Sequence, residues 1–284
     1  MAGSLNMNST VGDTWSTAYV GGFPHFGVGL TGGATFVDKA TTEKLFSTLG
    51  QSVPSGLDAV GIPIPAAAAT FKIGLPFIPL DIGLKAGLIP ESVGSSLSNL
   101  YGVTADYKNV GLSLRYALLK EKLLIPAVSV GLSANYLEGS VKAPLGSSQT
   151  FTGSNTDSYV AYSSPKLDLE WVSKNVDITA QVSKKIIFFT PYAGAGLTLG
   201  TSKVKGGVLA TVDNHLDASD QAALEAQGYS FTDQGFTYAT TNNSPTFRVY
   251  GGFSLDILLV LDCQVMYVPA TKNLGASVTA RIQL

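Results

Sequence analysis

Cysteine and charge are both scarce in this sequence. Its 284 residues include one cysteine, Cys263, so an intramolecular disulfide is excluded and a metal cluster is not expected. Only 13% of the residues are charged, against ~25% in an average soluble domain, and the formal net charge is -2. Because so small a charge gives no electrostatic attraction to nucleic acid, we expect no nucleic-acid partner.

Long hydrophobic runs are also missing, although 45% of the residues are hydrophobic. No run of ~18 consecutive apolar residues occurs, so the sequence offers no transmembrane helix. Met1 is followed by small polar residues rather than a signal peptide, and we expect that an export signal has been removed. Two fold classes remain, an unusually apolar soluble β-protein and a membrane β-barrel, because only closed barrels satisfy the backbone in lipid without helices. We favour the barrel.

Three stretches share one frame, which begins with proline and places Gly-Leu five and six residues later: residues 24–31, 126–133 and 191–200. A proline at the first position of a strand sacrifices no ladder hydrogen bond, and the residues beyond it alternate between two faces. In the third stretch one face is apolar and consists of Ala193, Ala195, Leu197 and Leu199. The other face is small or polar and consists of Tyr192, Gly194, Gly196 and Thr198. Such a strand is typical of a wall between lipid and a polar lumen.

The same alternation recurs through residues 23–284 and predicts an all-β, transmembrane, antiparallel up-and-down β-barrel of about ten strands. The second strand is expected over residues 68–77. At residues 173–175 the alternation changes phase, which indicates a bulge or a turn. We prefer the bulge; a further strand pair within residues 140–183 would give about twelve strands. Both counts are even, as single-chain bacterial barrels require.

The connections between the expected strands fall into two kinds. Short charged turns are predicted at residues 120–122 and 184–185, and long loops at 139–165 and 204–244. Short helices are expected in the external loops, at residues 40–49 and 218–227, the second closed by Gly228. Since outer-membrane barrels have short turns at one end, the proline-initiated strands should run outward. Residues 1–22 are expected to form an N-terminal periplasmic segment or plug, with a short interfacial helix or a tail at residues 9–22.

Several of these stretches resemble a known group of proteins. The strand Pro191-Tyr192-Ala193-Gly194-Ala195-Gly196-Leu197, the charged turns and the alternating final strand resemble bacterial outer-membrane β-barrel proteins. Pro-His-Phe-Gly at residues 24–27, and Val-Ser-Lys-Lys at 182–185 leading into Thr-Pro-Tyr at 190–192, are most similar to uncharacterised spirochaete-type barrels, some of which are described as like fatty-acid-transport porins. The resemblance implies an integral outer-membrane location and passage of small, apolar solutes. Barrel-assembly signals usually end in Phe, whereas this chain ends in Leu284.

The face assigned to the lumen carries charges of both signs and two tyrosines. They are Lys72, Asp81, Lys85, Arg115, Asp168, Glu170, Asp177, Tyr192, Arg248, Tyr250, Asp256, Asp262 and Arg281. With five bases and six acids, charge alone predicts no strong ion selectivity. The charges could line a constriction that contacts solute, or could pair to fix the strand registers. Likewise, the inner glycines could leave room for a passage or admit a plug; they are Gly27, Gly29, Gly194, Gly196 and Gly252.

Catalytic patterns are weak, and we do not expect an enzyme, a cofactor or a metal. His25 lies at a strand start, where a hydrogen-bonded rim residue is the simpler explanation. His215 lies near Asp213 and Asp217 in a polar loop, which is more typical of solvated surface than of an acid-base pair. The nucleophile elbow, the metal-binding His-Glu pattern and the phosphate loop are absent. Cys263 is assigned to the lipid face, and an aromatic girdle is expected from Tyr136, Trp171 and Tyr267.

Three functional hypotheses follow from the sequence. The first is a passive or substrate-selective outer-membrane channel for small solutes, and the second is a non-conducting barrel that displays its external loops to partners. A barrel hydrolase is a distant third. The expected partners are outer-membrane lipid and a small-molecule solute, and we expect a monomer.

Overall fold

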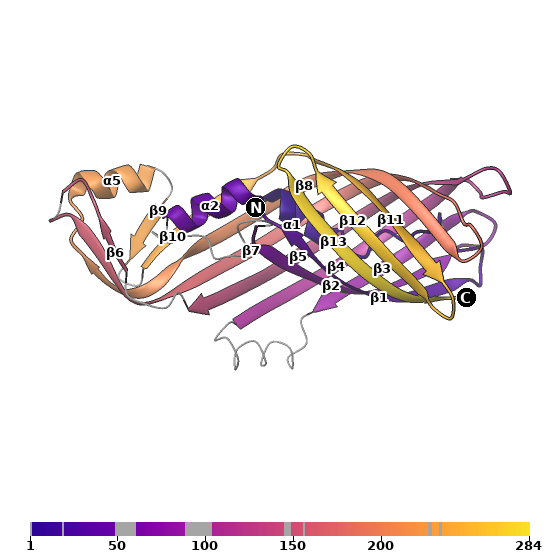
Figure 1. Cartoon of the computed structure of the whole chain (residues 1–284), viewed down its shortest axis with the longest axis horizontal. Coiled ribbons are helices and arrows are strands. Elements are labelled where there is room, and N and C mark those ends of the chain that lie inside the picture. The colour runs from indigo at the N-terminus through magenta and orange to yellow at the C-terminus, as the bar shows by residue number, and fades with distance from the viewer. Residues whose placement is uncertain are drawn as a thin grey trace.

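The computed structural model describes residues 2–18, 20–48, 61–88, 104–144, 149–155, 157–226, 229–232 and 235–284. Ten long strands each pair antiparallel with the next, and β1 with β13 and β7 with β8 close the ring (Figure 1). They are β1 (Phe26–Phe36), β2 (Pro63–Gly74), β3 (Leu80–Leu88), β4 (Thr104–Leu119), β5 (Ala127–Pro144), β7 (Tyr159–Ser183), β8 (Phe189–Asn214), β11 (Thr246–Asp256), β12 (Val260–Val268) and β13 (Asn273–Gln283). The predicted closed antiparallel barrel is confirmed, with ten strands rather than twelve.

The two faces of each barrel strand differ as the alternation predicts. Along β13, Ser277, Thr279 and Arg281 are buried, whereas Val278 and Ile282 are exposed on the outside. Side chains of this apolar kind cover the outer surface of every barrel strand, an arrangement that a soluble protein avoids and that lipid stabilises. Each wall strand is paired with a neighbour on both sides, which closes the sheet as a bilayer requires. The fold is that of a membrane β-barrel. None of the helices among the described residues is long and apolar enough to cross a membrane.

Three strands continue well past the barrel. β5, β7 and β8 contain 18, 25 and 26 residues, against 9 in β12. Their far parts carry β6 (Gln149–Thr152), α5 (Ala218–Ala226), β9 (Tyr229–Thr232) and β10 (Gly235–Asn242). We call these far parts and the four added elements the extension, seen at the left of Figure 1. The long loops predicted at 139–165 and 204–244 are therefore wrong in large part. Their Ser- and Thr-rich composition reads as loop, but edge pairing supplies the hydrogen bonds that make them strands.

The predicted helices are present. α2 (Lys39–Thr48) follows Asp38, whose carboxylate accepts a 2.9 Å hydrogen bond from the Thr41 N–H as an N-cap does. α5 occupies the second predicted position, with Gln227 and Gly228 outside the described residues. The second strand was predicted too late, because β2 runs from Pro63 to Gly74 and residues 75–79 form the turn.

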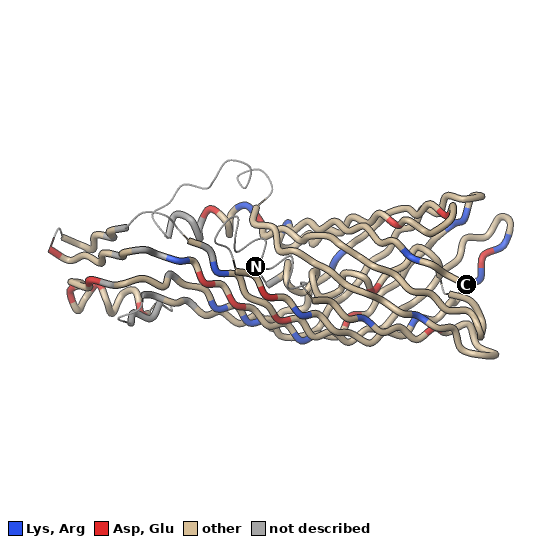
Figure 2. Tube along the Cα trace, turned by 90° about the horizontal axis from the view of Figure 1, so that it is seen from below, with Lys and Arg blue, Asp and Glu red and all other residues tan. Residues whose placement is uncertain are grey.

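The bulge predicted at residues 173–175 is wrong. β7 pairs with β5 in one unbroken register, and its bulge lies further along, between Ser163 and Lys166 on the side of β8. Leu169 and Trp171 therefore face inward, so Trp171 is not part of an outer girdle. The apolar residues change faces because the strand leaves the apolar band at this point, and its outer face then meets water. Figure 2 shows charged residues following one another along this far part of the molecule.

The first residues of the chain lie inside the barrel. α1 (Ala2–Ser9) and the turns and bends that follow it are almost entirely buried, with Leu5, Met7, Val11 and Trp15 at 0–1% exposure. We call residues 2–20 the N-terminal segment; Tyr19 lies outside the described residues. The helix occupies residues 2–9 rather than the 9–22 that the sequence suggested. It runs beside the loop-side ends of the strands, and the remainder descends to the short turns, where β1 begins (Figure 1).

Candidate functional site

The lumen is the candidate site, and Asp13 of the N-terminal segment lies at its centre. The Asp13 carboxylate is 2.7 Å from the Lys85 ammonium and accepts hydrogen bonds from Ser133 Oγ and Asn135 Nδ2 at 3.0 and 2.9 Å. The Lys72 ammonium donates to the Asp13 carbonyl oxygen. Four side chains from β2, β3 and β5 thus hold one residue, and all four are buried. Charge-assisted bonds of this kind are the strong ones in a water-poor interior.

Trp15 fills the lumen next to Asp13. Its ring lies 5.0 Å from the Lys72 ammonium and 5.0 Å from the Arg281 guanidinium, a cation–π arrangement on both counts. On the wall, a Cβ at Gly27 would come within 2.7 Å of the indole, so glycine is required for the ring to fit. The Trp15 carbonyl oxygen accepts hydrogen bonds from Arg115 and Gln181 at 3.2 and 2.9 Å. The segment is therefore matched to the wall in shape as well as in charge.

Three ion pairs join wall strands inside the barrel, two of them between neighbouring strands and the third from β7 to β11 across β8. Asp81 pairs with Arg115, Asp177 with Arg248, and Asp262 with Arg281, each with a nitrogen–oxygen distance of 2.8 Å. All six side chains are at most 8% exposed. Buried charges need partners and further hydrogen bonds to offset desolvation, and these pairs have both.

Asp262 links the wall to the N-terminal segment. Besides Arg281, it accepts hydrogen bonds from the Tyr192 hydroxyl at 2.6 Å and from the Ser16 backbone N–H at 3.0 Å. Arg281 in turn donates to Ser16 Oγ at 2.6 Å. On the opposite side of the barrel, Asp81 also links the wall to the segment, because its carboxylate accepts a hydrogen bond from the Val20 N–H at 2.9 Å. Two of the three ion pairs, Asp81–Arg115 and Asp262–Arg281, thus also bind the segment.

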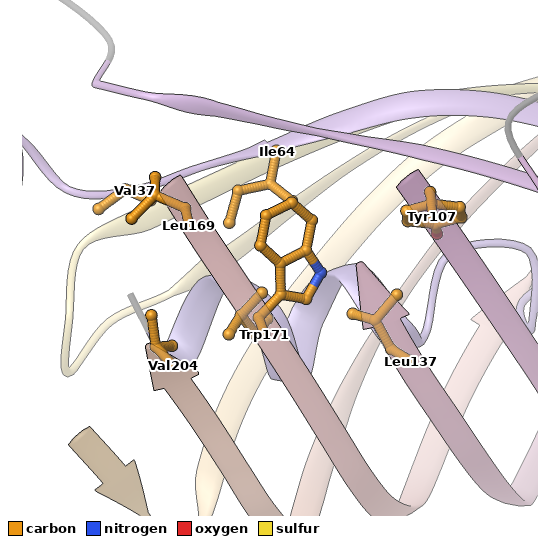
Figure 3. Packing of buried hydrophobic residues seen from close by; sticks show 8 residues of the cluster. Val37, Ile64, Tyr107, Leu137, Leu169, Trp171 and Val204 are labelled. Atoms are coloured by element: carbon orange, nitrogen blue, oxygen red, sulfur yellow. The ribbon is translucent and has the colours of Figure 1, made fainter. Parts of the chain in front are cut away.

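The loop-side mouth is closed by an apolar cluster rather than by charge. Figure 3 shows the side chains of this cluster converging from several strands, with the Trp171 indole directed toward Ile64. Its members are Leu5, Val37, Ile64, Tyr107, Leu137, Leu169, Trp171 and Val204. Below it, Asn8 donates to Thr35 Oγ1 and accepts from the Tyr107 hydroxyl at 3.2 Å. The inner face of the wall is therefore apolar at this mouth, although it is polar below.

The room beside the inner glycines is occupied by large side chains. A Cβ at Gly196 would lie 2.8 Å from the Arg248 guanidinium, and one at Gly252 would lie 2.8 Å from the Tyr192 hydroxyl. A void of about 20 Å³ remains beside Asp13, Lys72 and Arg115, which is space for about one water molecule. In this conformation the N-terminal segment fills the lumen at the level of Asp13 and Trp15.

Ten of the thirteen residues assigned to the lumen are buried inside the barrel. They are Lys72, Asp81, Lys85, Arg115, Asp177, Tyr192, Arg248, Tyr250, Asp262 and Arg281. Three assignments need correction. Asp168 faces outward and pairs with Lys142 at 3.1 Å, and Glu170 is exposed beside it, because β7 keeps one phase. Asp256 lies at the short-turn rim, where it pairs with Lys185 at 2.6 Å and both side chains are substantially exposed.

Sequence reasoning missed the residues that the N-terminal segment contributes, Asn6, Asn8, Asp13 and Trp15. One signal for them was present. Once Asp168, Glu170 and Asp256 are removed, the wall interior holds five cations and three carboxylates, so a further buried acid was required. Asp13 supplies it.

The two histidines show no catalytic geometry. The exposed His25 ring is hydrogen-bonded to the Gly22 carbonyl oxygen at the rim. His215 Nε2 is 3.0 Å from Asp213 Oδ1, but both side chains are more than half exposed, and the ring packs against Tyr159 at 4.8 Å. Within the described ranges, no three His, Cys, Asp or Glu side chains are placed to hold a metal ion.

In the extension, Asp220 of α5 fastens the helix to the neighbouring strand connection. Its carboxylate accepts hydrogen bonds from Ser158 Oγ at 2.6 Å and from the N–H and Oγ of Ser154 at 2.9 and 3.0 Å. Asn155 donates to Asp217 at 2.8 Å and adds a second link. These bonds favour the charged carboxylate and hold the pKa of Asp220 below its ordinary value.

We expect low pH to weaken the hydrogen bonds by which Asp220 holds α5 to this connection. Because the folded pKa of Asp220 is depressed, its stabilising contribution is complete above the unfolded value of about 3.9 and is lost as pH falls through the folded pKa. Amide hydrogen exchange of α5 should therefore accelerate below about pH 4, whereas exchange in β12 should not. Asp220→Asn should show the fast exchange already at pH 7. Equal exchange of α5 in both proteins at pH 7 would contradict the role given to the carboxylate.

No family model matches this chain, and no curated protein does. Among solved structures, it is similar to the outer membrane protease OmpT from Escherichia coli, with 10% identity, a TM-score of 0.42, and coverage of 92% of this chain and 97% of that one. It is also similar to the translocator domain of the autotransporter NalP from Neisseria meningitidis, with 8% identity, a TM-score of 0.32, and coverage of 91% of this chain and 86% of that one. A third similar structure is Ail, the attachment invasion locus protein of Yersinia pestis, with 8% identity, a TM-score of 0.29, and coverage of 91% of this chain and 98% of that one. At these scores the similarities carry no argument about function, and the barrel assignment rests on the strand pairing of this chain.

Proposed function

We propose that this protein is an integral barrel of the bacterial outer membrane, closed by its own N-terminal segment, which presents its extension to a partner outside the membrane. The observation that supports closure is the position of Asp13 and Trp15, held by buried side chains in a lumen with a void of about 20 Å³. An outer-membrane location is supported by the even number of strands, the apolar outer surface and the contrast between short turns and a long far end.

Presentation of the extension is supported by its construction. β7 and β8 remain paired from the barrel out to Val160 and Asn214, so the extension is a continuation of the rigid wall. Its outer face is charged, with Lys142 and Asp168 paired and Glu170, Lys203 and Lys205 exposed. A stiff polar sheet of this kind offers a surface for recognition, which functional loops on rigid scaffolds commonly provide.

A substrate-selective channel is the second candidate. The N-terminal segment is held by hydrogen bonds and ion pairs, which a bound partner or solute could exchange for its own. The wall interior is polar over most of its length, so an opened lumen would suit a small anion better than an apolar solute. The narrower resemblance to spirochaete-type, fatty-acid-transport-porin-like barrels remains a prediction from the sequence.

Planar bilayer recording of the refolded full chain tests closure. We expect a silent membrane, with folding checked separately by a β-sheet circular dichroism spectrum and resistance to proteolysis. Reproducible unit steps from folded protein would instead support the channel.

A further inference from the structure

The short turns at the barrel end opposite the extension have apolar tips. The fully exposed apices include Phe77 at 104%, Leu124 at 89%, Ile187 at 83% and Leu258 at 97% relative exposure. They belong to four different turns, which join β2 to β3, β4 to β5, β7 to β8 and β11 to β12. Phe23 and Leu284, where the chain enters and leaves the barrel, are also exposed at this end. The apolar apices therefore follow the whole rim rather than one side of it.

Two of these apices occupy backbone conformations that their side chains disfavour. Phe77 has φ = 69° and Ile187 has φ = 58°, in the left-handed region where Gly, Asn and Asp are preferred. The turn at Ile187 is a tight hairpin, with Ile186 and Phe189 paired on either side. A two-residue hairpin with positive φ only at its first central residue favours Gly there, and a β-branched residue is a genuine outlier in that conformation. A turn exposed to water would be more stable with a polar residue at this position. The apolar side chain therefore indicates contact with an apolar environment.

The charged side chains near these turns pair with one another. Lys184 lies 3.4 Å from Glu121 and donates to the Lys122 carbonyl oxygen at 2.5 Å, and Lys185 pairs with Asp256. These links join neighbouring turns and leave the apices apolar. Four lysines and two acids lie in the turns, Lys120, Lys122, Lys184 and Lys185 with Glu121 and Asp256, an excess of positive charge that suits anionic lipid.

On β4 the apolar height of the outer face is smaller than the apolar band of an outer membrane. On β4 the outward apolar residues run from Val110 to Leu118, and the Lys108–Glu138 pair with Tyr136 marks the upper limit. The eight steps from Val110 to Leu118, at ~3.3 Å each and tilted by ~45°, give about 19 Å of height, against ~25 Å for an outer-membrane apolar band. The apolar turns extend this lipid-facing surface by about the missing length.

We propose that the short-turn end is immersed in the bilayer, with its apolar apices at the boundary between lipid headgroups and acyl chains, rather than projecting into periplasmic water. A ring of separate apices fits a planar lipid interface, because the apices lie on four different turns around the rim. Continuity with the lipid-facing wall and the missing height both favour lipid over a protein partner. The inference does not depend on whether the lumen conducts.

Spin-label accessibility tests the proposal. Leu124→Cys and Leu258→Cys, each in a Cys263→Ala background, are labelled with a nitroxide and reconstituted in vesicles of phosphatidylcholine and phosphatidylglycerol. Both side chains are almost fully exposed, so folding should be preserved. Val278→Cys, on the outer wall, serves as the lipid reference, and Lys272→Cys, in the turn between β12 and β13, serves as the water reference.

We expect both apex labels to collide more often with oxygen than with a water-soluble nickel chelate, as the Val278 label does. The Lys272 label should show the opposite ratio. If the apex labels match Lys272, the turns stand in water, the proposal is overturned, and a protein partner becomes the better explanation of the apolar ring. Two independent apices keep the test decisive if one variant does not fold.

Discussion

A variant that lacks residues 2–20 should conduct ions in planar bilayers where the full chain is silent. The segment occupies the lumen from the apolar cluster at Leu5 to the Val20 N–H, and its removal leaves a polar interior that water enters. The ten-stranded wall does not depend on the segment for its backbone hydrogen bonds, since every wall strand is paired on both sides. Open steps should therefore appear without loss of the β-sheet spectrum.

The same variant should prefer anions. Its inner wall holds five cations, Lys72, Lys85, Arg115, Arg248 and Arg281, and three carboxylates, Asp81, Asp177 and Asp262. With Asp13 gone, the excess of two positive charges in a narrow lumen favours anions, and reversal potentials in a salt gradient measure this preference.

A shorter deletion provides the matched control. Removing residues 2–8 takes away most of α1 but leaves Asp13 and Trp15 in their contacts, so this variant should remain silent. If the longer deletion is folded and silent as well, the segment is not what closes the barrel. If the shorter deletion conducts equally, closure lies at the apolar cluster instead.

Asp262→Asn should be the most destabilising conservative substitution in the wall. It removes the charge that faces Arg281, which is 0% exposed, and places an amide where the Tyr192 hydroxyl and the Ser16 N–H donate. Breaking a buried pair while leaving one charge uncompensated costs about 3–5 kcal/mol. Denaturant unfolding of the reconstituted protein, followed by intrinsic fluorescence, measures the change in free energy.

Asp168→Asn is the appropriate control, because Asp168 has the same chemistry but faces outward in the extension. Its ion pair with Lys142 at 3.1 Å is partly exposed, and its loss should cost less than ~1 kcal/mol. Equal effects at the two positions would show that Asp262 is not a buried hub.

A further prediction of the geometry is that Arg281→Met combined with Asp262→Leu recovers much of the loss, since no buried charge is then left alone.

The barrel and most of its inner residues could be predicted from the sequence, because alternation inside the apolar band has one physical meaning. Arg115 lies between outward Leu114 and Tyr116, so it can only face the lumen. The same rule failed for Asp168 and Glu170 on β7. Beyond the band the outer surface meets water, polar residues move outside, and alternation alone does not show where the band ends. Lys174 lies on the outer face of β7. The appearance of a charged residue on this face is the sequence feature that marks where the apolar band ends.

The N-terminal segment could not be placed from its own residues. It carries Asn6, Asn8 and Asp13 without periodicity, and polar residues without periodicity ordinarily indicate a solvated tail. Here they are buried because the surrounding wall is itself polar: Asn6 bonds to Ser202 and Thr246, and Asp13 to Asn135. Polarity predicts exposure only when the available interior is apolar, and a β-barrel reverses that condition.

The position of the N-terminal segment also constrains the order of assembly. The segment precedes β1, and β1 meets β13 at the seam, so one of its contacts, from the Ser16 N–H to Asp262, joins residues 246 positions apart. Threading the segment through a finished ring would require Trp15 to pass a wall to which it is closely fitted at Gly27. We therefore expect the strands to gather around the segment and the seam to close last. In refolding, such a late step between the two ends of the chain makes closure of the ring slow.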